Sequence, residues 1–112
     1  MIDVNTVKEM IATYVKHGWI LRRFLLNSTL KNELGVSFLN FSSEVKIVDS
    51  AFNAAWFSRP PKDGGVAWEI RYLGEISFAL LENIDEEDAE FENQLRNVEK
   101  RLSDSIAGKR SA

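Results

Sequence analysis

A short basic and aromatic segment near the N-terminus holds the residues whose chemistry is easiest to recognise. It consists of Lys16, His17, Trp19, Arg22 and Arg23. Guanidinium and ammonium groups beside an aromatic ring can bind a small anion or a phosphorylated ligand. Neighbouring side chains of a β-strand point to opposite faces, so we expect that Arg22 and Arg23 do not share one patch. The sequence favours a solvated edge, at which one arginine pairs with an acid, over an anion-binding pocket.

The inventory of catalytic residues is small. The chain has one histidine and no cysteine, so a Cys–His dyad is excluded and a Ser–His–acid triad would have to use His17. His17 stands at the predicted end of a helix, where a positive or capping side chain is favoured. We therefore name no catalytic residue, and the sequence leans against an enzyme.

Two other segments resemble ligand sites only at first sight. Gly64 and Gly65 belong to no dinucleotide or P-loop pattern. The acidic run 85–88 lacks the spaced oxygen ligands and the central glycine of a calcium loop, and its carboxylates suit the first turn of a helix. We expect no metal and no cofactor.

Length and charge limit the class of protein further. The chain has 112 residues and a net charge of −3, which argues against a nucleic-acid partner. No apolar run approaches the roughly 20 residues of a membrane span, and the N-terminus lacks a signal-peptide pattern. We expect a cytoplasmic protein that does not bind membranes, with one domain over residues 1–107 and a flexible tail over 108–112.

The elements that must position these residues begin with a predicted meander of three strands over residues 52–84. Turn signals at 60–65 and 74–75 divide it, and apolar residues alternate with charged ones between Val66 and Tyr72. A two-residue turn at 74–75 would place Phe78 on the face of the charged residues. Pairing Tyr72 with Ile76, and Trp56 with Trp68, instead gathers the apolar side chains on one face, and we favour this register.

The remaining elements follow from capping and periodicity. Asp3 or Thr6 caps a first helix that ends at Gly18. Residues 19–26 read as a strand, with a continuation of the helix as the alternative. Residues 28–34 read as a short helix, with Ser28 as its cap and Gly35 as its stop, and residues 45–48 as a short strand. Residues 86–106 form a long helix with acids in its first turns and bases in its later ones.

The long helix carries a narrow apolar stripe, with successive members four, three, four and four residues apart. Its members are Phe91, Leu95, Val98, Leu102 and Ile106. Such a stripe resembles a coiled-coil seam more than a face sunk in a broad core. The second face of the meander is neither polar nor apolar, and we expect a helix or a second copy of the chain to cover part of it.

These patterns predict an α+β fold: an antiparallel sheet of about four strands, made by the meander 52–84 and strand 19–26, flanked by an N-terminal helix and a long C-terminal helix. We hypothesise a non-catalytic protein that acts through protein–protein contacts as a homodimer. The candidate interface is Phe91, Leu95, Val98 and Leu102 on the helix, with Ala55, Phe57, Arg71 and Ala79 on the sheet. The alternative is a small-molecule or anion-binding domain that uses the basic and aromatic segment.

Overall fold

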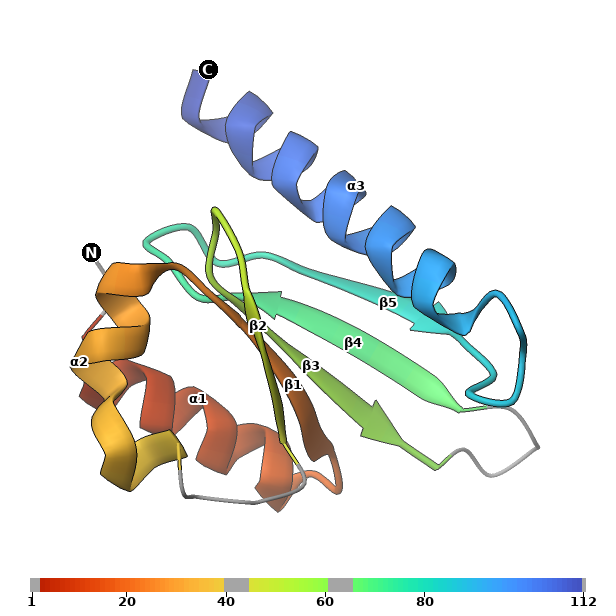
Figure 1. Ribbon diagram of the computed structural model, residues 1–112, viewed down its shortest axis with the longest axis horizontal. Helices are drawn as coiled ribbons and strands as arrows, with labels where there is room; N and C mark the ends of the chain where they lie inside the picture. The colour runs from red at the N-terminus through yellow and green to blue at the C-terminus, as the bar shows by residue number, and fades with distance from the viewer. Residues whose placement is uncertain (1–2, 40–44, 61–65, 112) are drawn as a thin grey trace.

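The computed structural model describes residues 3–39, 45–60 and 66–111, and it forms a five-stranded mixed sheet with helices on both faces (Figure 1). The elements in chain order are α1 (Val4–Lys16), β1 (Ile20–Leu26), α2 (Ser28–Leu39), β2 (Lys46–Asp49), β3 (Ala54–Arg59), β4 (Ala67–Tyr72), β5 (Ala79–Asn83) and α3 (Phe91–Ser111). The strand order is β2-β1-β3-β4-β5. The α+β class and the two flanking helices are as predicted. Within the described residues, no helix combines the length and apolar character of a membrane span.

The sheet differs from the prediction in one strand. β2 joins its edge and runs parallel to β1, whereas the other neighbours are antiparallel. A parallel neighbour needs a crossover connection, and α2 lies in the connection between β1 and β2. The prediction of an antiparallel sheet of about four strands was therefore close in its count, one strand short, and wrong in this pairing.

Two hydrophobic cores lie on the two faces of the sheet. One is formed beneath α1 and α2 and includes Val7, Ile11, Leu30 and Leu34. The other lies beneath α3 and includes Trp56, Trp68 and Ile70, together with Leu95, Val98, Leu102 and Ile106 from the helix. Successive side chains of the central strands point to opposite faces, so each of these strands contributes residues to both cores.

The first helix begins and ends as predicted. The Asp3 side chain accepts a hydrogen bond from the Thr6 backbone N–H at 2.8 Å, and Gly18 has a φ of +88°, which disfavours a side chain. The second helix differs, because it continues through Gly35 to Leu39. A glycine costs a helix only about 1 kcal/mol relative to alanine. Its cap is Asn27, whose side chain accepts from the Leu30 N–H at 2.9 Å, and not Ser28.

The meander keeps the predicted faces with different pairings. Trp56 lies opposite Ile70, and Trp68 lies opposite Ser58, although the two indole rings still meet edge-on at 6.0 Å. Tyr72 donates its N–H to the Phe78 carbonyl at 2.9 Å, so the loop before β5 is longer than predicted. Each pairing is displaced by two residues, and a displacement of two leaves every side chain on its face.

A β-bulge in β1 overturns the prediction for the two arginines. Leu21 pairs with Phe57, and Arg23 pairs with Trp56, so Arg22 is the extra residue. The extra residue turns both arginine side chains toward the α3 face. There Arg22 donates to Ser58 at 3.1 Å, and Arg23 donates to Glu92 on α3. Strict alternation placed them on opposite faces and was wrong at this point.

The C-terminal helix starts later than predicted, at Phe91. Asp85 and Asp88 side chains accept hydrogen bonds from the N–H groups of Glu87 and Glu90, at 2.9 and 2.8 Å, and fold the acidic run into turns before the helix. At the other end, α3 runs to Ser111. It thereby includes all of the predicted tail 108–112 except Ala112, which lies outside the described residues.

Candidate functional site

The basic and aromatic segment does not form one site. Lys16 and His17 are exposed at the end of α1, where the His17 Nδ1 lies 2.8 Å from the Thr13 carbonyl oxygen. Trp19 packs edge-on against Tyr14, and the Arg59 guanidinium lies 4.7 Å from the Trp19 ring centroid. Arg22 and Arg23 point to the other face, so the sheet separates them from the rest of the predicted pocket.

Arg22 and Arg23 attach α3 and the turn before it to the sheet. Arg22 makes two hydrogen bonds to the Glu86 carboxylate, at 3.1 and 2.7 Å, and its guanidinium lies 4.9 Å from the Trp68 ring centroid. Arg23 makes two to Glu92, at 2.9 and 2.6 Å. This hydrogen bonding holds the pKa of Glu92 below its usual value and raises that of Arg23.

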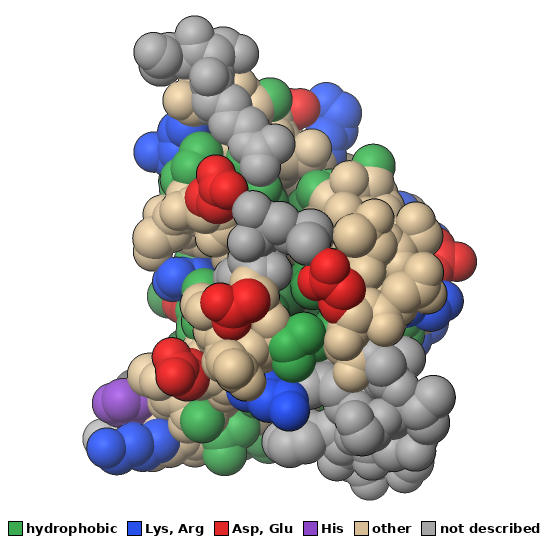
Figure 2. Space-filling model, turned by 90° about the vertical axis from the view of Figure 1, so that its left-hand side faces the viewer, with side chains coloured by type: hydrophobic (Ala, Val, Ile, Leu, Met, Phe, Trp, Pro, Cys, Tyr) green, Lys and Arg blue, Asp and Glu red, His purple; other side chains and the backbone are tan. Residues whose placement is uncertain are grey.

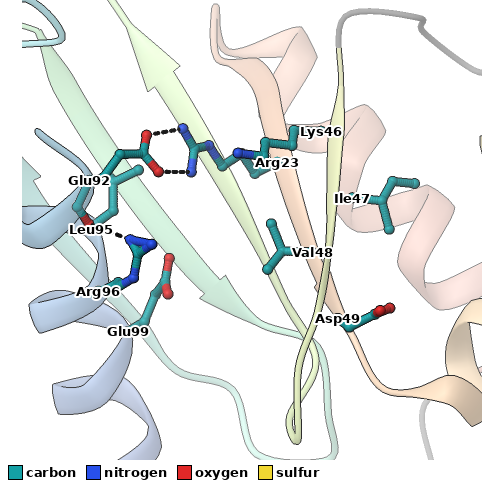
Figure 3. A pocket seen from close by; sticks show the side chains of 9 residues that line it. All are labelled: Arg23, Lys46, Ile47, Val48, Asp49, Glu92, Leu95, Arg96 and Glu99. Atoms are coloured by element: carbon teal, nitrogen blue, oxygen red, sulfur yellow. Dashed lines mark hydrogen bonds and ion pairs between the residues drawn. The ribbon is translucent and has the colours of Figure 1, made fainter.

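A groove of about 350 Å³ lies beside the Arg23–Glu92 pair, between α3 and the strands β1 and β2 (Figure 3). Its lining residues are Arg23, Lys46, Ile47, Val48, Asp49, Glu92, Leu95, Arg96 and Glu99. The helix reaches the sheet here through Glu99, whose carboxylate accepts a hydrogen bond from Trp56 Nε1 at 2.8 Å. Burial raises the pKa of Glu99. We call this space the charged groove.

The predicted interface residues divide into covered and uncovered sets. Leu95, Val98 and Leu102 are buried on the sheet of their own chain, and Phe91 packs edge-on against Trp68 at 5.2 Å. Ala55 and Phe57 are buried in the core beneath α1 and α2. An interface built on these six residues would require a helix to leave the sheet. Arg71 and Ala79 remain partly exposed.

Arg71 and Ala79 belong to a half of the sheet that α1 and α2 leave uncovered. We call this half the open face; it consists of Ala67, Glu69, Arg71, Ala79 and Leu81 on β4 and β5, in register with one another. The Leu81 side chain is 60% exposed. At its inner border, the Tyr14 hydroxyl donates to the Glu69 carboxylate, and the Tyr14 ring stacks on Phe57.

The two edge strands differ in their side chains. β2 has four residues, and its end residues Lys46 and Asp49 are exposed charges. β5 has the sequence Ala-Leu-Leu-Glu-Asn, without lysine or proline. Charges, especially lysine, and proline are the usual means by which an edge strand avoids pairing with another chain. β5 has only Glu82, which lies on the α3 face and contacts Arg101.

Charge is dispersed on the face of the molecule that Figure 2 shows, where acidic and basic side chains lie scattered among uncharged ones in the coloured residues. No group of three or more histidine, aspartate or glutamate residues suited to a metal ion occurs in ranges 3–39, 45–60 and 66–111. Comparison with family models, curated proteins and solved structures finds no match to the chain.

Sequence reasoning missed most of the charged groove. Lys46, Arg96 and Glu99 lie far from Arg23 in the chain, and only the β1–β2 pairing and the docking of α3 bring them together. One signal was present. Glu92, Arg96 and Glu99 are spaced four and three residues apart, which places them on one side of a helix, next to the apolar stripe.

Proposed function

We propose that the protein acts through protein–protein contacts and forms a homodimer in which the β5 strands of two copies pair antiparallel. The exposed Leu81 in the centre of an edge strand that lacks lysine and proline carries this proposal. It retains the predicted homodimer and, of the predicted interface on the helix and the sheet, keeps only the part that includes Arg71 and Ala79 on the open face. A cytoplasmic location and the absence of a nucleic-acid partner stay predictions.

The sequence of β5 supports pairing with a second copy of itself. A two-fold axis at Leu81 places this residue opposite its own copy, Leu80 opposite Glu82, and Ala79 opposite Asn83. Like charges directly opposite each other destabilise a sheet, and this register contains none. Leu81 gains an apolar neighbour, and the outward N–H and C=O groups of both strands gain partners.

The open face lies beside this contact. Ala79 is part of the paired strand, and Glu69 and Arg71 border the exposed leucine from the neighbouring strand. A copy placed by the two-fold axis extends the sheet to ten strands. Each open face then lies beside the other, with the leucines at its centre.

Solution mass by light scattering across a dilution series tests the proposal. Wild-type protein at tens of micromolar is expected to have the mass of two chains. Leu81→Lys is expected to have the mass of one, because a buried lysine pair at the two-fold axis repels. Val15→Lys is the matched control, since Val15 is 51% exposed and lies on α1. A wild-type mass of one chain at these concentrations would overturn the proposal.

A further inference from the structure

The charged groove lies away from the proposed dimer contact, at the opposite edge of the sheet and on the opposite face. Its residues come from β1, β2 and α3. Figure 3 shows Arg96 and Glu99 extending from α3 toward the strands, with the Arg23–Glu92 pair at one end of the space. Its volume of about 350 Å³ falls in the range of small-molecule sites.

One end of the groove holds more positive than negative charge. Arg23 and Lys46 are register partners on parallel neighbouring strands, so their side chains share a face. Arg96 follows Glu92 by one helical turn, and its guanidinium donates a 3.5 Å hydrogen bond to the Glu92 carbonyl oxygen. Glu92 therefore lies among three cations, all of which lower its pKa.

Two of these three cations, Lys46 and Arg96, have no carboxylate partner in the described structure. Glu92 is held by Arg23, and Asp49 pairs with Lys31 at 3.1 Å. Among the described residues, no carboxylate lies within ion-pair distance of Lys46 or Arg96. Two cations without a carboxylate partner, at the edge of a groove, suit a ligand that brings its own carboxylates.

Glu99, about one helical turn after Arg96, is a carboxylate without a cation at ion-pair distance in the described structure, although Arg23 and Arg96 lie close enough to lower its pKa in part. Glu99 accepts from Trp56 Nε1 through Oε2, and it is partly buried beside Leu95. Its pKa is raised because burial disfavours the charged form. An ammonium group donating to the Glu99 carboxylate would offset that cost.

We propose that the charged groove binds a small amino acid with an acidic side chain. Its two carboxylates lie at Lys46 and Arg96, and its ammonium group lies at Glu99. Such a ligand carries two negative charges and one positive charge. These charges complement Lys46, Arg96 and Glu99, which form no ion pair in the described structure. Val48 and Leu95 border the methylene groups of the ligand.

The test uses backbone amide NMR signals of the full chain, titrated with L-glutamate, with glutarate, which lacks the amine, and with inorganic phosphate. We expect L-glutamate to shift the signals of Val48 and Leu95 saturably, with a Kd at least ten-fold below that of glutarate or phosphate. One charge-assisted hydrogen bond is worth about 1.5–3 kcal/mol, and 1.4 kcal/mol is ten-fold in Kd.

Three variants assign the roles. Arg96→Gln is expected to weaken L-glutamate binding at least ten-fold. Glu99→Gln keeps an acceptor for Trp56 and is expected to abolish the preference for L-glutamate over glutarate. Arg101→Gln, on the same helix but outside the groove, is expected to change neither value. Absence of saturable shifts at millimolar L-glutamate, equal affinity for glutarate, or an unaffected Arg96→Gln variant would each overturn the proposal.

Discussion

Near each of its two edges the sheet has a half-face that the helices do not fully cover, and the two halves carry different side chains. Helices α1 and α2 pack on one face near β1, and α3 packs on the other near β4 and β5. Each face therefore has one half without a helix. On the α1 side the uncovered half is the open face at β5, and on the α3 side it is the half at β1 and β2 (Figure 1). The charged groove lies between this second half and α3.

The difference between these halves lies in their side chains. The β5 edge presents an exposed leucine and no lysine, whereas the β2 edge presents Lys46 and Asp49 beside the ion pairs of Arg23 and Lys31. An apolar edge with free backbone groups favours a second strand, and a charged recess favours a small polar ligand. Incomplete helix cover thus leaves two surfaces with different side-chain chemistry.

The largest expected effect is on the free energy of unfolding, when a buried leucine and an exposed leucine are each replaced by alanine. Leu102→Ala, in the core beneath α3, is expected to lower the free energy of unfolding by about 2–5 kcal/mol, because it leaves a cavity. Leu81→Ala at the exposed edge is expected to change it by less than about 0.5 kcal/mol in dilute protein. Urea unfolding measures both. Equal effects of the two substitutions would mean that α3 is not firmly docked on the sheet.

A smaller effect compares the two ion pairs at the charged groove. Arg23→Gln is expected to cost about 1 kcal/mol, because Arg23 is largely buried and would leave Glu92 without its partner, although Glu92 is half exposed. Lys31→Gln removes the more exposed pair with Asp49 and is expected to cost less than about 0.5 kcal/mol. A larger loss for Lys31→Gln than for Arg23→Gln would contradict this order.

The pH dependence of stability should distinguish Glu92 from Glu99. The pKa of Glu92 is lowered on folding, so its contribution is present above its usual value of 4.5 and is lost as the pH falls. The pKa of Glu99 is raised, so its protonated form favours folding, and stability is lost as the pH rises through the raised value. We expect Glu99→Gln to gain stability relative to wild type between pH 4.5 and pH 7. Urea midpoints across this range measure the difference, and a constant difference would contradict it.

Alternation and capping predicted the faces of the meander, the first helix and the α3 stripe, because burial acts on each of these locally. The two-residue displacement of Trp56 against Trp68 was hidden, since both registers bury the same side chains. The bulge at Arg22 was equally hidden, because a single inserted residue has no signature in composition. The charged groove depends on both the bulge and the parallel β2 strand. Lys46, Arg96 and Glu99 could therefore not be predicted from the sequence as residues of one site.

The most direct test of the β5 contact uses the absence of cysteine from the chain. In the proposed register Leu81 lies opposite its own copy, with Cβ atoms about 5 Å apart, close enough for a disulfide after small adjustments. We expect Leu81→Cys to form covalent dimers on mild oxidation at micromolar concentration, much faster than Ala79→Cys, which lies opposite Asn83, or Val15→Cys on α1. Dimer formation by Leu81→Cys no faster than by Val15→Cys would contradict the β5–β5 homodimer.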